Sequence, residues 1–406
     1  MKIAIINYNF TGTTISLAKA FLDKGHHVDL YCGIYLTQNN EMEAFQVKKI
    51  PRIPGVWKIN TDNCTGLQQC KSKKFNFYII STITSGYNLR NIFNRIAFFI
   101  SKLQVKIHCN FLRMKRYDYV CVIGQDPISI YYNVHIGEHI FNTHTFHEVL
   151  VNHLANNKQL LPVVTQTISK NINIIVHSEY NKNIILENNN VISDTVHFIP
   201  FGKYISYLEF KDTTKITEIS KAKDYILFIG YITPYKGLST LYHAIQTIEK
   251  KLSPDIKVVI AGKGNDSITR NMMSNNRFIL IHRWLTNNEI VTLIKKSKII
   301  VCPYLSASQS GIPQTAFVFN KPVIATNVGA FSEIIENNIN GWLIPKEDPS
   351  TLGNLLLNIY NNDIIYTQVI QNIKTDNYKD KTFVWTNIID KYIDIIKRGY
   401  DHKHKI

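Results

Sequence analysis

The sequence of 406 residues lacks the features that mark several classes of protein. Its six cysteines are scattered, with no Cys-x-x-Cys pair, so neither a disulfide framework nor a cysteine-based zinc site is indicated. The amino-terminal segment reaches the polar Asn7 too soon for the apolar core of a signal peptide. No uncharged apolar run approaches the roughly 18 residues that a membrane-spanning helix needs. These absences favour a globular protein of a reducing, cytoplasmic compartment.

Acidic residues are absent between Asp62 and Asp118, although ten lysines and arginines lie in that interval. The whole chain carries a formal charge of +16, which favours anionic partners such as nucleic acid, an anionic membrane face or phosphate-bearing substrates. None of the standard nucleic-acid recognition modules is legible, so we expect no nucleic acid partner.

Residues 90–116, within this acid-free interval, predict a basic amphipathic helix. Its apolar residues recur at helical spacing, and they are Ile92, Phe93, Ile96, Phe99, Ile100 and Leu103. Such a helix fits an anionic membrane surface, with the apolar side chains entering the lipid interface. It fits equally well an ordinary domain helix whose apolar face packs on a sheet. The sequence leaves both interpretations open.

Two successive series of strands and helices organise the chain. The first begins with an apolar strand over residues 2–7, a helix that stops at Gly25 and a strand over 27–32. The second begins with a strand over residues 225–229 and is more regular than the first. The polar stretch 202–224 separates the two series. We therefore expect an α/β protein of two doubly wound domains, with ligands bound at the carboxyl ends of the strands.

Histidines cluster between His135 and His153, and one segment spells His-x-x-Glu-His from His135 to His139. Zinc chemistry would need both histidines on one helix, whereas Gly137 is expected to end the helix between them. His147 and Glu148 instead follow an expected strand over residues 139–145, where α/β proteins bind ligands. No Asp-x-Asp pair is present to hold a metal on a diphosphate. We predict no metal site.

A glycine-bounded loop, Gly230–Gly237, connects the strand at 225–229 to the next helix. Lys236 directly precedes Gly237 at the expected start of that helix. A lysine charge beside free backbone N–H groups suits a diphosphate. The spacing is not that of a P-loop nucleotide triphosphatase.

From this loop onward the chain resembles the retaining glycosyltransferases of family four, which belong to the group 1 enzymes and have the GT-B fold. The resemblance is specific over residues 225–360 and rests on segments in order: Gly230 with 235–237, 258–264, 301–303, Gly311, 321–326, 328–330, Glu333 and 340–341. Upstream it is weaker and rests on Gly12, 25–28, 147–148, 176–179 and 199–202, and Trp385 matches the closing segment.

The resemblance implies GT-B architecture, with two Rossmann-like domains facing a cleft. An acceptor-side domain would span residues 1–205, a nucleotide-sugar-binding domain 206–382, and a final helix in 383–406 would pack back on the first domain. It also implies a retaining, metal-independent glycosyltransferase of EC class 2.4 without a cofactor. The enzyme would transfer a sugar from a nucleotide-diphosphate donor to a glycan or lipid-linked acceptor, in surface polysaccharide synthesis. The expected location is cytoplasmic, and residues 90–116 leave open a peripheral position on the inner membrane face.

The resemblance also implies roles for individual residues. Lys236 would contact the departing diphosphate and His147 would line the donor-sugar pocket, so these two are the predicted catalytic residues. The remaining predicted donor-binding residues are Gly12, Tyr231, Arg283, Gln309, Ser310, Gly311 and Thr315.

Two landmarks of the family are altered. Tyr231 stands where an arginine commonly shares the phosphate contacts, and we expect Arg283 to compensate. The positions of two family glutamates hold Ala307 and Thr315, or Ser308 and Ala316 if the register shifts by one. These changes motivate one alternative to a transferase, a non-catalytic nucleotide-sugar-binding relative or scaffold. A sugar-nucleotide epimerase or hydrolase on the same architecture is a second alternative.

Overall fold

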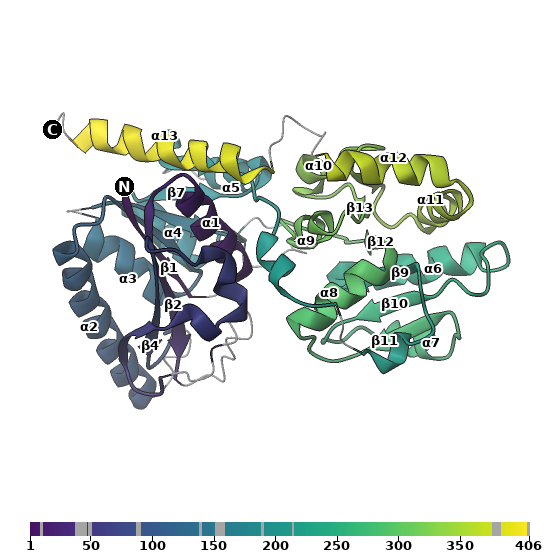
Figure 1. Ribbon diagram of the computed structural model, residues 1–406, viewed down its shortest axis with the longest axis horizontal. Coiled ribbons are helices and arrows are strands. Elements are labelled where there is room, and N and C mark those ends of the chain that lie inside the picture. Colours follow the sequence, from purple (N-terminus) through teal and green to yellow (C-terminus); the bar gives the residue numbers. More distant parts are fainter. Residues whose placement is uncertain are drawn as a thin grey trace. The chain divides into compact units, whose positions relative to one another are not determined.

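The computed structural model describes residues 1–8, 11–36, 47, 51–86, 91–137, 140–150, 159–187, 191–212, 215–375 and 383–403. These residues form two compact units (Figure 1). Unit 1 takes the described chain up to Gly202 and resumes at Phe383, and unit 2 takes the described residues between 203 and 382.

Unit 1 is built on an eight-stranded sheet in the order β3-β4-β2-β1-β5-β6-β7-β8. Neighbouring strands are parallel except at the edge, where β3 runs antiparallel to β4. The central strands are apolar runs buried on both faces, as parallel sheets require. The strands are β1 (Lys2–Asn7), β2 (His27–Tyr35), β3 (Gly55–Ile59), β4 (Phe75–Thr82), β5 (Tyr119–Ile123), β6 (Phe141–Phe146), β7 (Asn173–Val176) and β8 (Val196–Phe198).

Helices cover both faces of this sheet. Its α-helices are α1 (Thr11–Asp23), α2 (Ile92–Met114), α3 (Pro127–Ile136), α4 (Pro162–Ser169), α5 (Glu179–Leu186) and α13 (Trp385–Lys403). α1 and α13 share one apolar core with the sheet, whereas α2 and α3 share a second core. Asp126 caps α3 by accepting a hydrogen bond from the Ser129 N–H at 3.0 Å, and Gly137 is its carboxyl cap, as the sequence predicts.

Unit 2 contains a six-stranded parallel sheet in the order β11-β10-β9-β12-β13-β14. The strands are β9 (Tyr225–Ile229), β10 (Val258–Ala261), β11 (Phe278–Ile281), β12 (Ser297–Cys302), β13 (Val323–Thr326) and β14 (Gly341–Ile344). The α-helices are α6 (Leu238–Ile248), α7 (Thr269–Met273), α8 (Asn287–Lys296), α9 (Ile312–Val318), α10 (Phe331–Ile334), α11 (Pro349–Asn361) and α12 (Asp363–Lys374). Strands β9, β10 and β11 follow one another toward one edge of the sheet, and strands β12, β13 and β14 follow one another toward the other edge.

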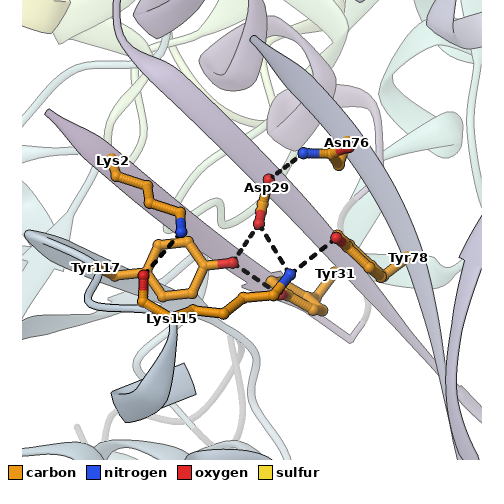
Figure 2. Close-up of polar contacts among 7 residues, drawn as sticks. All are labelled: Lys2, Asp29, Tyr31, Asn76, Tyr78, Lys115 and Tyr117. Carbon is orange, nitrogen blue, oxygen red and sulfur yellow. Dashed lines mark hydrogen bonds and ion pairs between the residues drawn. The ribbon is translucent and has the colours of Figure 1, made fainter. Parts of the chain in front are cut away.

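Polar side chains at the amino edge of the unit 1 sheet form a cluster that we call the Asp29 cluster (Figure 2). Asp29 pairs with the ammonium group of Lys115 at 3.3 Å and accepts hydrogen bonds from Asn76 at 2.7 Å and from Tyr117. Lys115 also donates to the Tyr78 hydroxyl at 2.8 Å. The remaining members are Lys2, which donates to the Lys115 carbonyl, and Tyr31, which bonds the Tyr117 hydroxyl. This cluster ties β1, β2, β4 and the end of α2 together.

Candidate functional site

The loops that follow β9 and β12 meet where the strand order of unit 2 changes direction. Leu305 N–H, after β12, donates to the carbonyl of Tyr235, after β9, at 2.8 Å. Gly237 lies in the left-handed region with φ of 68°, and an added Cβ would overlap the Pro303 carbonyl oxygen. The glycine is therefore required for the two loops to approach. Ligands of doubly wound sheets bind at such a position.

Lys236 extends from this loop beside an aromatic wall. It ends the 3-10 turn η6 (Pro234–Lys236), and its ammonium group lies 3.8 Å from the centre of the Tyr304 ring and 5.1 Å from that of Tyr235. Cation–π contacts of this kind hold a lysine side chain in one place without neutralising its charge. The site therefore presents a positioned positive charge next to the backbone of both loops.

Buried oxygens without protein partners surround the same loops. Among the described residues of these loops and of α9, such oxygens include those of Thr233, Ser308, Gln309 and Gln314. A buried polar atom left without a hydrogen bond costs about 1–3 kcal/mol, so native proteins rarely retain several close together in sequence. A hydrogen-bonding ligand at these loops would relieve that cost.

The predicted residues Ser310, Gly311 and Thr315 lie at the entry to α9. Thr315 donates its hydroxyl proton to the Gly311 carbonyl at 2.8 Å, and the Ser310 hydroxyl accepts from the Ile312 N–H at 3.4 Å. An added Cβ on Gly311 would lie 2.6 Å from the Tyr204 hydroxyl. The Thr315 hydroxyl is thus engaged with the helix backbone, while Gly311 allows Tyr204 to pack against the loop.

A second group of predicted residues lines a pocket beyond β9, β10 and β11. Tyr231 and Trp284 are both exposed, and their ring centres are 6.0 Å apart. Lys263 places its ammonium group 5.7 Å from the Trp284 ring, and His282 and Arg283 complete the wall. Exposed aromatic rings at strand ends offer a stacking surface for a planar group.

Arg283 is held by carboxylates in this arrangement. Its guanidinium lies 2.6 Å from a Glu289 oxygen and 3.8 Å from a Glu218 oxygen. Glu289 also forms the capping box of α8 with Thr286, so its position is fixed from a second side. Arg283 reaches the pocket, but part of its charge is balanced by its own neighbours.

In unit 1, His147 directly follows β6 and lies in a buried aromatic stack. The Phe201 ring centre is 4.8 Å from that of His147 and 3.8 Å from that of His177. Burial lowers the pKa of His177 to about 4 and that of His147 well below its ordinary value, because charged imidazole is costly away from water. His147 is therefore neutral at physiological pH, and Trp385 and Tyr392 of α13 line the same pocket.

Gly12 is the second residue of α1, and the next residue, Thr13, lines the His147 pocket. Gly12 and His147 thus belong to unit 1, whereas every other predicted site residue belongs to unit 2.

The structure gives no support for a metal centre among the residues that it describes. No group of three His, Cys, Asp or Glu side chains is placed to hold an ion there. His144 faces the interior, where it bonds the Gly124 carbonyl at 3.0 Å and the Thr167 hydroxyl at 3.2 Å. His139 and His153 lie outside the described residues.

Comparison with known proteins finds a family model that matches part of the chain, within unit 2. The loops that carry Lys236, Arg283 and Gln309 lie within residues 209–376. These residues match the family model of Glycosyl transferases group 1. The group 1 match covers the predicted site residues of unit 2, but not Gly12 or His147.

Relatives resemble the chain over part of its length. An uncharacterized glycosyltransferase of Methanocaldococcus jannaschii is 29% identical over 167 residues, which are 40% of this chain and 45% of that protein. The UDP-Gal:alpha-D-GlcNAc-diphosphoundecaprenol alpha-1,3-galactosyltransferase of Escherichia coli is 26% identical over 219 residues, 52% of this chain and 53% of that protein. The chain thus spans about half the length of these curated relatives.

Solved structures match over nearly the whole chain. Anabaena HepE in complex with UDP superimposes with a TM-score of 0.64 at 13% identity, covering 98% of this chain and all of that one. Sucrose-phosphate synthase of Thermosynechococcus elongatus gives a TM-score of 0.65 at 15% identity, covering 99% of this chain and all of that one. The expected fold is confirmed: two Rossmann-like units with parallel sheets, as in GT-B glycosyltransferases.

Proposed function

We propose that this protein is a retaining, metal-independent glycosyltransferase that moves a sugar from a nucleotide-diphosphate donor to a glycan or lipid-linked acceptor. The observation that carries the proposal is the positioned Lys236 charge beside buried, unpartnered oxygens at the switch point of unit 2. A donor diphosphate supplies negative charge for Lys236, and a donor sugar supplies hydroxyl groups for Thr233, Ser308, Gln309 and Gln314.

Lys236 has a chemical role in this proposal. As the bond between the sugar and the diphosphate breaks, negative charge grows on the departing phosphate oxygen, and Lys236 stabilises it. The acceptor oxygen bonds to the sugar carbon and its proton passes to the leaving diphosphate, so that charges and atoms balance. Lys236 thereby takes the part that a metal ion plays in other transferases.

The nucleotide base is assigned to the pocket beside Tyr231 and Trp284. Both rings are exposed at strand ends and can stack on a planar base, and Lys263 adds positive charge at the rim. Tyr231 then contributes a stacking surface in place of the phosphate contact of the family arginine. For His147 and Gly12 of unit 1, contact with the donor sugar is a separate proposal that rests on the family resemblance.

Relatives support the acceptor class. One is named for transfer of galactose from UDP-Gal to a GlcNAc-diphosphoundecaprenol, a lipid-linked glycan. A bacterial protein encoded in a cps region is also 22% identical over 180 residues. We propose surface polysaccharide assembly as the setting in which this chain works.

Thermal unfolding in the presence of UDP, GDP, ADP or CDP tests the donor site directly. A ligand that binds only the folded state raises the unfolding midpoint by mass action. We expect one nucleotide to shift the midpoint by several degrees, with the same shift in the presence of a chelator. A shift that disappears with the chelator would overturn metal independence, and no shift with any nucleotide would overturn the donor site.

A non-catalytic nucleotide-sugar-binding protein is the second candidate. It is favoured by the missing carboxylates at Ala307 and Thr315 and by the pairing of Arg283 with Glu289. Binding without sugar transfer to any polyprenyl-linked or glycan acceptor would support it. Release of free sugar or isomerised donor without an acceptor would instead indicate a hydrolase or an epimerase.

A further inference from the structure

α2 leaves a continuous apolar face outside the core of unit 1. Nine of its large apolar side chains are exposed, and they are Ile92, Phe93, Ile96, Phe99, Ile100, Leu103, Ile107, Phe111 and Met114. Their exposed fractions range from 41% to 81%, and they make up half of the eighteen large apolar side chains exposed in the described residues. Monomeric soluble proteins rarely expose so concentrated a patch without using it.

The helix itself is firmly held, so this exposure is not a sign of loose packing. On its inner face Val105, Cys109 and Leu112 are buried in the core that contains strands β1, β2 and β5 and helix α3. The Asn91 side chain caps its first turn by accepting from the Asn94 N–H at 2.7 Å. α2 lies along the outside of unit 1 (Figure 1). One face of the helix therefore packs on the core of the sheet, and the other presents apolar side chains from Ile92 to Met114.

Positive charge accompanies the apolar face. Arg95, Lys106 and Arg116 are exposed on or directly after α2. Lys102 extends over the rings of Phe98 and Tyr131, at 5.0 Å and 5.2 Å from their centres. No aspartate or glutamate occurs between residues 62 and 118, so no acid within this stretch offsets these charges.

The exposed apolar side chains and the basic side chains of α2 together indicate which kind of partner this face binds. A second copy of this chain would bring the same lysines and arginines against each other, which is unfavourable at contact distance. An anionic lipid bilayer offers negative headgroups for the basic side chains and acyl chains for the apolar ones, which is how interfacial helices bind. At 23 residues the helix is about 34 Å long, enough to lie across several lipids. No helix in the described chain is long and apolar enough to cross a membrane.

We propose that α2 is an interfacial membrane anchor that lies in the plane of an anionic bilayer, with its apolar face in the lipid and its basic residues at the headgroups. This inference goes beyond sugar transfer, because it concerns where unit 1 works rather than what unit 2 binds. A lipid-linked acceptor would then be presented in the same interface.

Flotation of the full chain with vesicles tests the anchor. Vesicles of phosphatidylcholine alone are compared with vesicles containing about 30% phosphatidylglycerol, at 0.1 M and 0.5 M NaCl. We expect binding to the anionic vesicles at least tenfold stronger than to the neutral ones, and a marked loss at high salt because screening weakens headgroup attraction. Equal binding to both vesicles, or none to either, would overturn the proposal.

Matched variants separate the apolar and the charged contributions. Phe93→Ser with Phe99→Ser should abolish flotation, whereas Ile364→Ser, at an exposed apolar residue of α12, should leave it unchanged. Arg95→Glu with Lys106→Glu should weaken binding by more than about 20-fold, because each basic residue near an anionic surface is worth roughly fivefold. Lys250→Glu, at an exposed lysine of unit 2, is the charge control.

Two further measurements keep the outcome unambiguous. The altered residues are exposed, so circular dichroism and the nucleotide-induced midpoint shift should be the same as for the parent protein. Sedimentation equilibrium without vesicles reports self-association. A dimer that Phe99→Ser dissociates, together with no flotation, would assign the face to a second copy and overturn the membrane anchor.

Discussion

Both units are doubly wound sheets, and the two groups of buried polar side chains described above lie at opposite edges of them. In unit 1 the Asp29 cluster lies at the amino edge, and Asp29, Lys115 and Tyr117 satisfy one another (Figure 2). In unit 2 the buried oxygens of Ser308 and Gln314 follow the carboxyl ends of the strands and have no partner among the described residues.

The difference separates polar groups that hold the fold from polar groups that await a ligand. A partnered cluster stabilises the protein by itself, and removing one member leaves the others buried without partners. An unpartnered oxygen destabilises the empty protein and stabilises only the complex. The following predictions test this distinction, from the largest effect to the smallest.

The largest expected difference between the units is their response to acid. Burial lowers the pKa of His108 and His144 to about 3 and that of His177 to about 4, and all three lie in unit 1. The unfolded histidines take up protons below their ordinary pKa near 6.5, so folded stability is lost as pH falls from about 6.5 toward 4. At pH 5 each of these buried histidines lowers the free energy of unfolding by about 2 kcal/mol. The described histidines of unit 2, His243 and His282, are exposed. We therefore expect the stability of unit 2 to change less than that of unit 1 over the same pH range.

Tryptophan fluorescence can follow the two units separately during this titration. Trp284 and Trp342 report on unit 2, and Trp57 and Trp385 on unit 1, so pairwise Trp→Phe variants isolate each signal. Asp126 acts in the opposite direction, because burial raises its pKa to about 6 and protonation stabilises the folded state as pH falls below that value. This gain in stability offsets part of the loss that one buried histidine causes. Simultaneous acid unfolding of both units would contradict the prediction.

Asp29→Ala should destabilise unit 1 by about 3 kcal/mol, because it leaves the buried Tyr117 and the half-buried Lys115 without their acceptor. Urea unfolding measured through Trp57 and Trp385 gives the change in free energy. Asp62→Ala is the matched control: its contact with Lys71 is exposed, and its loss should cost less than about 1 kcal/mol. The nucleotide-induced shift of unit 2 should survive both changes.

Lys236→Met should lower sugar transfer about 100-fold while leaving the unfolding midpoint within about 2 °C of the parent. The lysine stabilises developing phosphate charge, and loss of one such group typically costs 10²–10³ in rate. Steady-state kinetics and thermal unfolding are the two measurements, with Lys251→Met, at an exposed lysine of the same unit, as the control. Normal kcat and KM in a folded Lys236→Met protein would remove this residue from the site.

Ser308→Ala should change the free energy of unfolding least among these variants, but the direction of its change is informative. Because the Ser308 oxygen is buried without a partner, the variant should stabilise the empty protein by about 1 kcal/mol and weaken donor binding severalfold. Ser297→Ala removes a buried hydroxyl that donates to the Ile294 carbonyl at 2.8 Å, and it should destabilise by a similar amount. Urea unfolding and nucleotide titration measure both effects. A destabilised Ser308→Ala protein would show that its hydroxyl supports the fold.

The sequence predicts unit 2 better than unit 1 for physical reasons. The strands over 225–229 and 258–261 are uninterrupted apolar runs bounded by glycine, and local pattern suffices to find them. β3 is a partly exposed edge strand whose existence depends on pairing with β4, which is a tertiary contact. Neither β4 nor α12 is among the predicted elements. The run Phe75–Thr82 is apolar enough to indicate a strand from its local pattern alone.

The site shows the same limit. Lys236 and Gly237 are legible because their spacing reports a loop that leads into a helix. The approach of Tyr231 to Trp284 depends on the register of β9, β10 and β11, and no local motif encodes it. The sequence also does not say which side of α2 meets the sheet. The structure shows that all six predicted apolar residues are exposed and do not pack on the sheet, and their contact with a membrane stays a proposal.

The path of the chain also sets an order of events during synthesis. Ile388, Ile389 and Tyr392 of α13 belong to the same core as β1 and α1, so the first core of unit 1 cannot close until the ribosome has released α13. Unit 2 is complete in sequence by residue 382. Unit 2, although it is translated later than most of unit 1, can therefore fold first. The core of unit 1 is completed only after α13 has been synthesised. A nascent chain arrested before α13 should already bind a nucleoside diphosphate through a protease-resistant unit 2.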